Sequence, residues 1–143
     1  MYFAWATPAL MLLIALATFD PRDPALAAAL AAERSRSDQG VRGLVDSVKR
    51  AGGRLPRPVA LAAAEAIRLA HGAGGAVFLA HPLSYGLAAG DLEALVEELA
   101  AAGMDGIEAQ YGPYPPGDRE ALAALARRRG LAVCGGSDLH DTA

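Results

Sequence analysis

Short apolar runs alternate with helical patterns through the second half of the chain. The apolar runs have the length of buried strands and cover residues 76–80, 106–109 and 131–134. The helical patterns end at glycines and cover residues 60–71, 91–102 and 117–129. In the first of these helices, we expect the buried stripe to hold Leu61, Ala64, Ile67 and Ala70 or His71. Strands that alternate with helices of this size predict an α/β fold with a parallel sheet.

The start of the chain is a long apolar stretch. Residues 1–19 carry no charged side chain, and their length is close to the lower limit for a membrane span. No Lys or Arg precedes the stretch and Pro8 interrupts it, which argues against a secretory signal. We interpret it as a buried strand or core helix, with a signal or membrane anchor as the alternative. We therefore expect a cytoplasmic protein without a membrane partner.

A helical segment follows the apolar stretch. Asp23 and Pro24 are suited to an N-cap and a first helical position, and apolar residues then recur at helical spacing up to two glycines at 52–53. The polar stretch 33–42 is either a solvated part of this segment or a break between two helices. Two prolines within residues 54–58 predict an extended linker. The expected organisation is an apolar strand plus helical segment over 1–53, the linker over 54–58, and βα units over 59–143.

Composition limits the chemistry. A chain of 143 residues that is 53% hydrophobic can build the core of one domain. Its net charge of −3 gives no electrostatic reason to expect nucleic-acid binding. The single cysteine, Cys134, excludes an internal disulfide and a cysteine-based zinc cage. Any metal site must therefore use some of the three histidines together with carboxylates.

Polar side chains follow three successive predicted strands. His81 comes directly after the first, Glu108 lies at the end of the second, and Ser137, Asp138 and His140 follow the third. In parallel α/β folds the carboxyl ends of the strands meet at one rim, so we expect these side chains to converge there. Imidazole and carboxylate ligands suit zinc, manganese or iron. The two glycines before Ser137 are expected to let the backbone turn sharply. A lone histidine after a strand is more often a core histidine bonded to a backbone carbonyl, and it is the combination with the residues after the other strands that favours a metal site.

Short motifs in a fixed order resemble those of the PHP (polymerase and histidinol phosphatase) phosphoesterases. They are AHGAGG at 70–75, AHP at 80–82, GMDGIE at 103–108, RGL at 129–131 and GGSDLH at 135–140. The resemblance is strongest over residues 65–140 and extends more loosely to residues 19–26. It implies a distorted (β/α) barrel, of which this chain would form a part with an N-terminal helical segment.

The resemblance also implies an activity. It implies hydrolysis of a phosphate mono- or diester by metal-activated water, with divalent manganese, zinc or iron as cofactor and a phosphorylated small molecule or nucleotide as substrate. His81, Asp138 and His140 are then the metal ligands, whereas Glu108 and Ser137 lie beside the metal or the substrate. His71 matches a residue that ends a helix, where a cation is favoured.

Three tyrosines, Tyr85, Tyr111 and Tyr114, are expected in loops at the same rim. They either line a substrate pocket or cover the barrel mouth.

The sequence departs from the PHP pattern in its first half. The family opens with a His-x-His motif, but no histidine precedes His71 here. We therefore expect an incomplete PHP domain that corresponds to the C-terminal portion. Three ligands from one side would hold one ion weakly, and an incomplete sheet would leave an apolar edge through which the chain could self-associate. The alternative function is a non-catalytic PHP-like structural or partner-binding module with relic ligands.

Overall fold

The fold is known from a computed structural model, which describes residues 3–4, 13–16, 22–25, 27–28 and 39–136. The strands are β1 (Phe3–Ala4), β2 (Leu13–Leu16), β3 (Ala76–Leu79), β4 (Gly106–Tyr111) and β5 (Ala132–Gly136). The helices are α2 (Gln39–Arg50), α3 (Arg57–Gly72), α4 (Ala89–Ala101) and α5 (Pro116–Arg128), with the 3-10 segment η1 (Pro82–Tyr85). Residues 24–25 and 27–28 are also helical, directly after Asp23 as predicted.

The described strands form one five-stranded sheet in the order β1-β2-β3-β4-β5. β3, β4 and β5 run parallel, which confirms the α/β class and the parallel βα units. β1 and β2 pair antiparallel with each other, and β2 pairs antiparallel with β3, an arrangement that was not predicted. The strand interpretation of residues 1–19 thus holds for β1 and β2, and the rest of that stretch lies outside the described residues. The distorted (β/α) barrel stays a prediction, because the described strands form a linear order.

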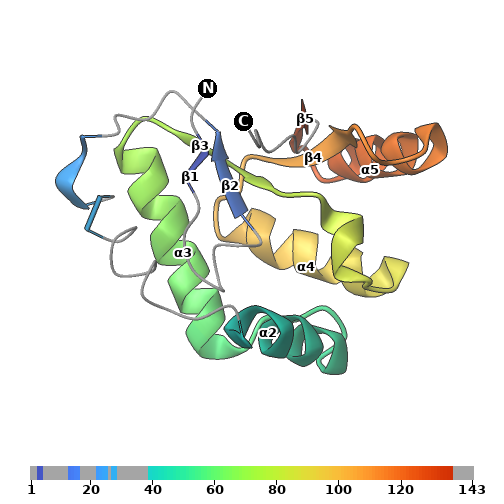
Figure 1. Ribbon diagram of the computed structural model, residues 1–143, viewed down its shortest axis with the longest axis horizontal. Coiled ribbons are helices and arrows are strands. Elements are labelled where there is room, and N and C mark those ends of the chain that lie inside the picture. Colours follow the sequence, from blue (N-terminus) through green and yellow to red (C-terminus); the bar gives the residue numbers. More distant parts are fainter. Residues whose placement is uncertain (1–2, 5–12, 17–21, 26, 29–38, 137–143) are drawn as a thin grey trace, which may run out of the picture.

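Helices α3, α4 and α5 pack along the parallel part of the sheet, and α2 lies by the ends of α3 and α4 (Figure 1). Leu44 and Val48 of α2 join residues of β3, β4 and the other helices in one hydrophobic cluster. No helix within the described residues has both the length and the apolar character needed to cross a membrane. The division into segments at 54–58 stays a prediction.

The buried stripe of α3 differs from the expected one. The helix buries Ala63, Ala66, Ile67 and Ala70, whereas Leu61 is 62% exposed. Three-residue steps drift around a helix, so two such steps separate Leu61 from Ile67 by about 120°. The prediction that Leu61 belongs to the core was therefore wrong.

Helix α3 also begins earlier than the predicted linker allows. Arg57 and Pro58 form its first turn, and the extended backbone before it ends at Pro56. Proline is tolerated in a first helical turn because the amide hydrogens there have no partner within the helix. The extended segment before the helix is thus confined to residues 54–56.

Two strand ends extend beyond their predicted limits. β4 continues to Tyr111, so Glu108 is its third residue and does not end the strand. Gly135 and Gly136, predicted to form a turn, belong to β5 and pair with Gln110 and Tyr111. The reason is close approach, because a Cβ at Gly135 would lie 2.8 Å from both Cβ and the carbonyl oxygen of Gln110.

Candidate metal centre at the carboxyl ends of the parallel strands

His81 leaves the sheet at the carboxyl end of β3, as predicted. It immediately precedes Pro82, the first residue of η1, and its backbone has φ 24° and ψ 63°. Among the described residues it is the only non-glycine residue with a positive φ. Such a conformation costs on the order of 1–3 kcal/mol and persists only where neighbouring contacts fix it. The fold therefore holds His81 in a strained position at the rim where a site was expected.

The imidazole of His81 is packed between aromatic rings. Its ring centroid lies 5.9 Å from that of Tyr85 and 5.6 Å from that of Tyr111. The Nδ1 atom is buried, and the part of the chain that the structure describes offers it no hydrogen-bond partner. A buried polar atom without a partner costs about 1–3 kcal/mol. Within the described residues, no backbone carbonyl therefore pairs with this nitrogen as the core-histidine alternative would require.

Glu108 is the one charged residue that is buried in the part of the chain that the structure describes. It is 5% exposed, and it lies next to an irregularity at which β4 gains a residue relative to β5 between Glu108 and Gln110. Such bulges reorient side chains and are frequent beside functional sites. Leu79 of β3 pairs with Ile107 of β4. If this register continues, Glu108 is level with the residue directly before His81. The carboxylate lies 3.9 Å from the position of a Cβ at Gly136, at the end of β5.

Tyr85 connects His81 with Glu108. Its hydroxyl donates a hydrogen bond to the carbonyl oxygen of Ala80, the residue before His81. Burial raises the pKa of this hydroxyl, and the nearby Tyr114 and Glu108 raise it further. Tyr85 therefore stays protonated and serves as a donor that holds the end of β3, not as a base.

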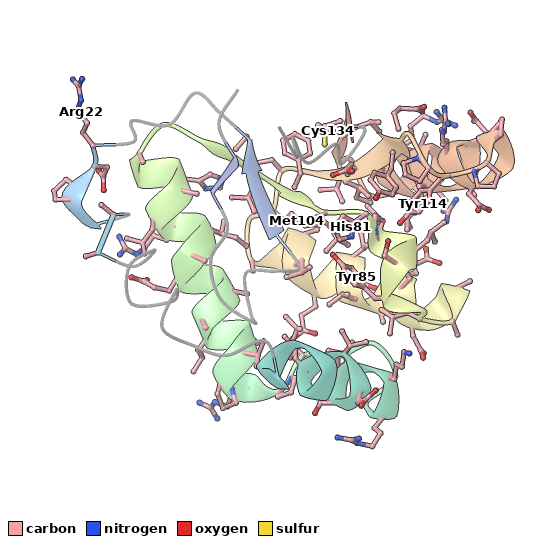
Figure 2. All side chains as sticks on the ribbon, viewed as in Figure 1. Arg22, His81, Tyr85, Met104, Tyr114 and Cys134 are labelled. Carbon is pink, nitrogen blue, oxygen red and sulfur yellow. The ribbon has the colours of Figure 1, made fainter. Side chains whose placement is uncertain are left out.

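The other two tyrosines form a connected aromatic cluster with His81. Tyr111 is the last residue of β4 and is buried, so its predicted loop position was wrong. Its ring meets that of Tyr114 edge-on, with 4.7 Å between the centroids. Figure 2 shows His81, Tyr85 and Tyr114 close to one another on the side of β4 and η1. Tyr85 and Tyr111 pack inward, which is typical of residues that cover the end of a sheet.

The third part of the predicted site lies outside the described residues. Ser137, Asp138 and His140 follow β5, whose last residue is Gly136. Their roles stay predictions. Among the described residues alone, no group of three or more metal-ligating side chains forms. Of the predicted site residues that the structure describes, His81 follows β3 and Glu108 lies within β4, and Tyr85 is near both of them.

Tyr114 lies in a loop at this rim, as predicted, but the two residues that it contacts here, Ser84 and Arg119, were not foreseen. Tyr114 Oη lies 3.1 Å from the backbone nitrogen of Ser84 and 3.2 Å from its Oγ. Arg119 donates to the carbonyl oxygens of Tyr114 and Gly112. These contacts join segments that follow different strands, so spacing along the chain carries no signal for them.

Comparison with known proteins gives local matches of moderate identity. The chain is 41% identical over 76 residues to the 5'-3' exoribonuclease Rnm of Escherichia coli (strain K12), which covers 53% of this chain and 26% of that protein. It is 39% identical over 69 residues to a 3',5'-nucleoside bisphosphate phosphatase of Chromobacterium violaceum, which covers 48% of this chain and 24% of that protein. The matches thus span about a quarter of the length of these relatives. No protein-family profile matches the chain.

A solved structure supports the fold. An amidohydrolase from Chromobacterium violaceum superposes with a TM-score of 0.66 over 90% of this chain and 62% of that chain, at 24% identity. At this identity the similarity concerns the fold alone. The two sequence relatives confirm, over part of this chain, the resemblance to the PHP phosphoesterases seen in the motifs, and the names of both relatives describe hydrolases.

Proposed function

We propose that this chain forms part of a divalent-metal-dependent phosphoesterase that hydrolyses phosphate esters of nucleotides. The observation that carries the proposal is the buried Nδ1 atom of His81, which has no partner among the described residues and lies at the carboxyl end of a parallel strand. Nitrogen of a neutral imidazole is a common ligand of divalent transition metals. The donor atom that the strained loop presents therefore fits a metal ion.

The proposed ligands are His81, Asp138 and His140. Imidazole nitrogen together with carboxylate oxygen suits manganese, zinc or iron, and such an ion supplies Lewis acidity at a phosphoryl group and activation of water when bound. The buried carboxylate of Glu108 adds negative charge at this end of the sheet, which favours a cation nearby. We place Ser137 beside the ion or the substrate, because it directly follows the last residue of β5.

The proposed substrate class follows from the two sequence relatives. One is an exoribonuclease and the other a phosphatase of 3',5'-nucleoside bisphosphates, so both names describe hydrolysis of phosphate esters of nucleotides. The shared chemistry is a phosphate ester on a ribose. A nucleoside bisphosphate and a short 5'-phosphorylated oligoribonucleotide are therefore the two substrates to assay.

The test compares the three histidines of the chain as ligands. The wild-type protein and the variants His81→Asn, His140→Asn and His71→Asn are dialysed to equilibrium against Mn²⁺, and the bound metal is determined against the dialysate. His71 is the matched control because it lies at the end of α3, where its partner is Asp105. We expect the wild type and His71→Asn to retain manganese, and both other variants to lose it. The loaded wild type is then assayed for release of phosphate from both substrates.

Two results would contradict the proposal. Equal metal content in the wild type and in His81→Asn would show that His81 is not a ligand. Bound metal without hydrolysis of either substrate would instead favour the non-catalytic PHP-like module.

A further inference from the structure

The loop between β4 and α5, residues 112–115, touches the segments that follow both neighbouring strands. The backbone nitrogen of Gly112 donates to the carbonyl oxygen of Gly136, the last residue of β5, at 2.7 Å. On the other side, Tyr114 Oη lies within hydrogen-bonding distance of the backbone nitrogen and Oγ of Ser84 in η1. Through these hydrogen bonds, the loop after β4 contacts both the segment that follows β3 and the last residue of β5.

Arg119 holds this loop from the start of α5. Its Nε donates to the carbonyl oxygen of Tyr114 at 2.7 Å, and its Nη2 donates to that of Gly112 at 2.8 Å. A cation near a helix N-terminus opposes the helix dipole, whereas the acidic Asp118 beside it is favourable there. The position of Arg119 is thus explained by the two carbonyl oxygens and not by stabilisation of its own helix. A planar guanidinium reaches both oxygens at once, which a lysine does not.

Two contacts lead from Tyr114 to His81. The first passes through Ser84, whose backbone nitrogen also donates to the carbonyl oxygen of His81 at 3.0 Å. The second passes through Tyr111, whose ring lies 4.7 Å from that of Tyr114 and 5.6 Å from that of His81. The backbone of His81 is strained, so contacts of this kind are needed to fix its orientation.

We propose that Arg119 is a positioning residue for the candidate metal centre. By fixing the carbonyl oxygens of Gly112 and Tyr114, it holds Tyr114 against Ser84 and Tyr111 and so orients the imidazole of His81. The inference rests on the proposed function, in which His81 binds a divalent ion. Residues that orient a metal ligand typically change metal affinity by about 10- to 100-fold when they are replaced.

The first experiment measures Mn²⁺ affinity by isothermal titration calorimetry. Arg119→Met is compared with the wild type and with Arg127→Met, a control on the same helix whose exposed guanidinium pairs with Glu120. We expect about tenfold weaker binding for Arg119→Met and unchanged binding for Arg127→Met. Arg119→Lys, which retains the charge but reaches one carbonyl oxygen at a time, should fall between Arg119→Met and the wild type. Unchanged affinity in Arg119→Met would overturn the proposal.

A second variant tests the route through the loop. Tyr114→Phe removes only the hydroxyl and retains the ring contact with Tyr111. This variant is therefore expected to fold, so that a change in its Mn²⁺ affinity reports on the lost hydrogen bond. If Arg119 acts through Tyr114, the double variant should bind Mn²⁺ no more weakly than the weaker of the two single variants. Losses that multiply would show that the two residues act independently, which would overturn the proposed route.

An NMR measurement separates this inference from the proposed function. The ring carbon–hydrogen signals of His81, assigned by their loss in His81→Asn, are compared in the metal-free proteins. We expect them to shift in Arg119→Met and Tyr114→Phe and to stay unchanged in Arg127→Met. A wild type that binds no Mn²⁺ would refute the proposed function alone, and the ring signals would then decide the positioning role. Unshifted signals in Arg119→Met would overturn it.

Discussion

His71 and Asp105 meet at the amino-terminal side of β3 and β4, with Nε2 of His71 2.8 Å from Oδ2 of Asp105. The same carboxylate oxygen accepts a hydrogen bond from the backbone nitrogen of Val77 at 2.7 Å. His71 was expected in the last turn of a helix, and it does lie there. One carboxylate therefore ties the end of α3 to the start of β3, at the opposite end of the strands from His81.

The two contacts of Asp105 predict unequal effects of substitution. Asp105→Ala should lower the free energy of unfolding by about 1–3 kcal/mol, because the buried amide of Val77 loses its acceptor. His71→Ala should cost less than about 1 kcal/mol, because the side chains of the pair are 40% and 37% exposed and water screens their attraction. Urea unfolding followed by circular dichroism measures both. Equal losses would mean that the pair with His71, and not the amide bond, determines the stability of this corner.

Gly135 predicts a second difference in stability. A Cβ at this position would press on Cβ and the carbonyl oxygen of Gln110, so Gly135→Ala should destabilise the pairing of β4 with β5 by about 1–3 kcal/mol. Gly43 is the matched control, because it lies within α2 with nothing within 4 Å of its hypothetical Cβ. Gly43→Ala should raise the unfolding free energy by about 0.5–1 kcal/mol.

Thermal unfolding of the two alanine variants checks this contrast. We expect a lower melting temperature for Gly135→Ala and a higher one for Gly43→Ala than for the wild type. A Gly135→Ala protein as stable as the wild type would show that β4 and β5 move apart at no cost.

These contacts show where local patterns determine this fold. The pattern that ends helices at glycines predicted α3, α4 and α5 to within a few residues, because it depends on neighbouring positions alone. The extension of β5 through Gly135 depends on how near Gln110 lies, and the antiparallel pairing of β2 with β3 joins residues about 60 positions apart. No periodicity along the chain reports such distances.

The candidate site likewise has features that the local sequence predicted and features that depend on contacts between distant segments. The position of His81 after β3 was predicted correctly, since the end of an apolar run is a local signal. Its positive φ was not foreseen, because a residue before proline usually has an extended backbone. The contacts from Arg119 and Tyr114 likewise arise only when loops from different strands meet.

Glu98 provides a third prediction, in a region that the functional motifs do not reach. Its Oε2 accepts a hydrogen bond from the backbone nitrogen of Leu55 at 2.9 Å, just before α3 begins. Glu98→Ala should therefore lower the unfolding free energy by about 1–2 kcal/mol, because Leu55 is buried and its amide loses a charged acceptor.

The neighbouring Glu97 gives the control for Glu98. It lies on the same helix, is 65% exposed and is 3.5 Å from Arg129. Glu97→Ala should change the unfolding free energy by less than about 0.5 kcal/mol. Guanidinium titration of both variants tests the difference, and a larger loss in Glu97→Ala than in Glu98→Ala would contradict it.

The last prediction concerns the thiol of Cys134, a residue of β5 that lies opposite Glu108 of β4 in the register of the two parallel strands. Burial raises the pKa of this thiol to about 12, and the negative charge of Glu108 contributes to the rise. Alkylation proceeds through the thiolate, so the native protein should react with iodoacetamide about a thousandfold more slowly at pH 8 than the urea-unfolded chain. Its rate should keep rising with pH up to about 12, whereas that of the unfolded chain levels off above its ordinary pKa. Cys134 is the only cysteine, so no other thiol contributes.

Glu108→Gln separates the two causes of the raised pKa. The substitution removes a negative charge that disfavours the thiolate, so the pKa of Cys134 should fall and the alkylation rate at pH 8 should rise. The rise should recover only part of the difference from the unfolded chain, because burial is the larger cause. Taking the ratio of the variant to the wild type at the same pH cancels the steric protection that both share. A rate that falls or stays constant in Glu108→Gln would show that the carboxylate of Glu108 does not act on Cys134, and would remove the evidence for its charge at this end of the sheet.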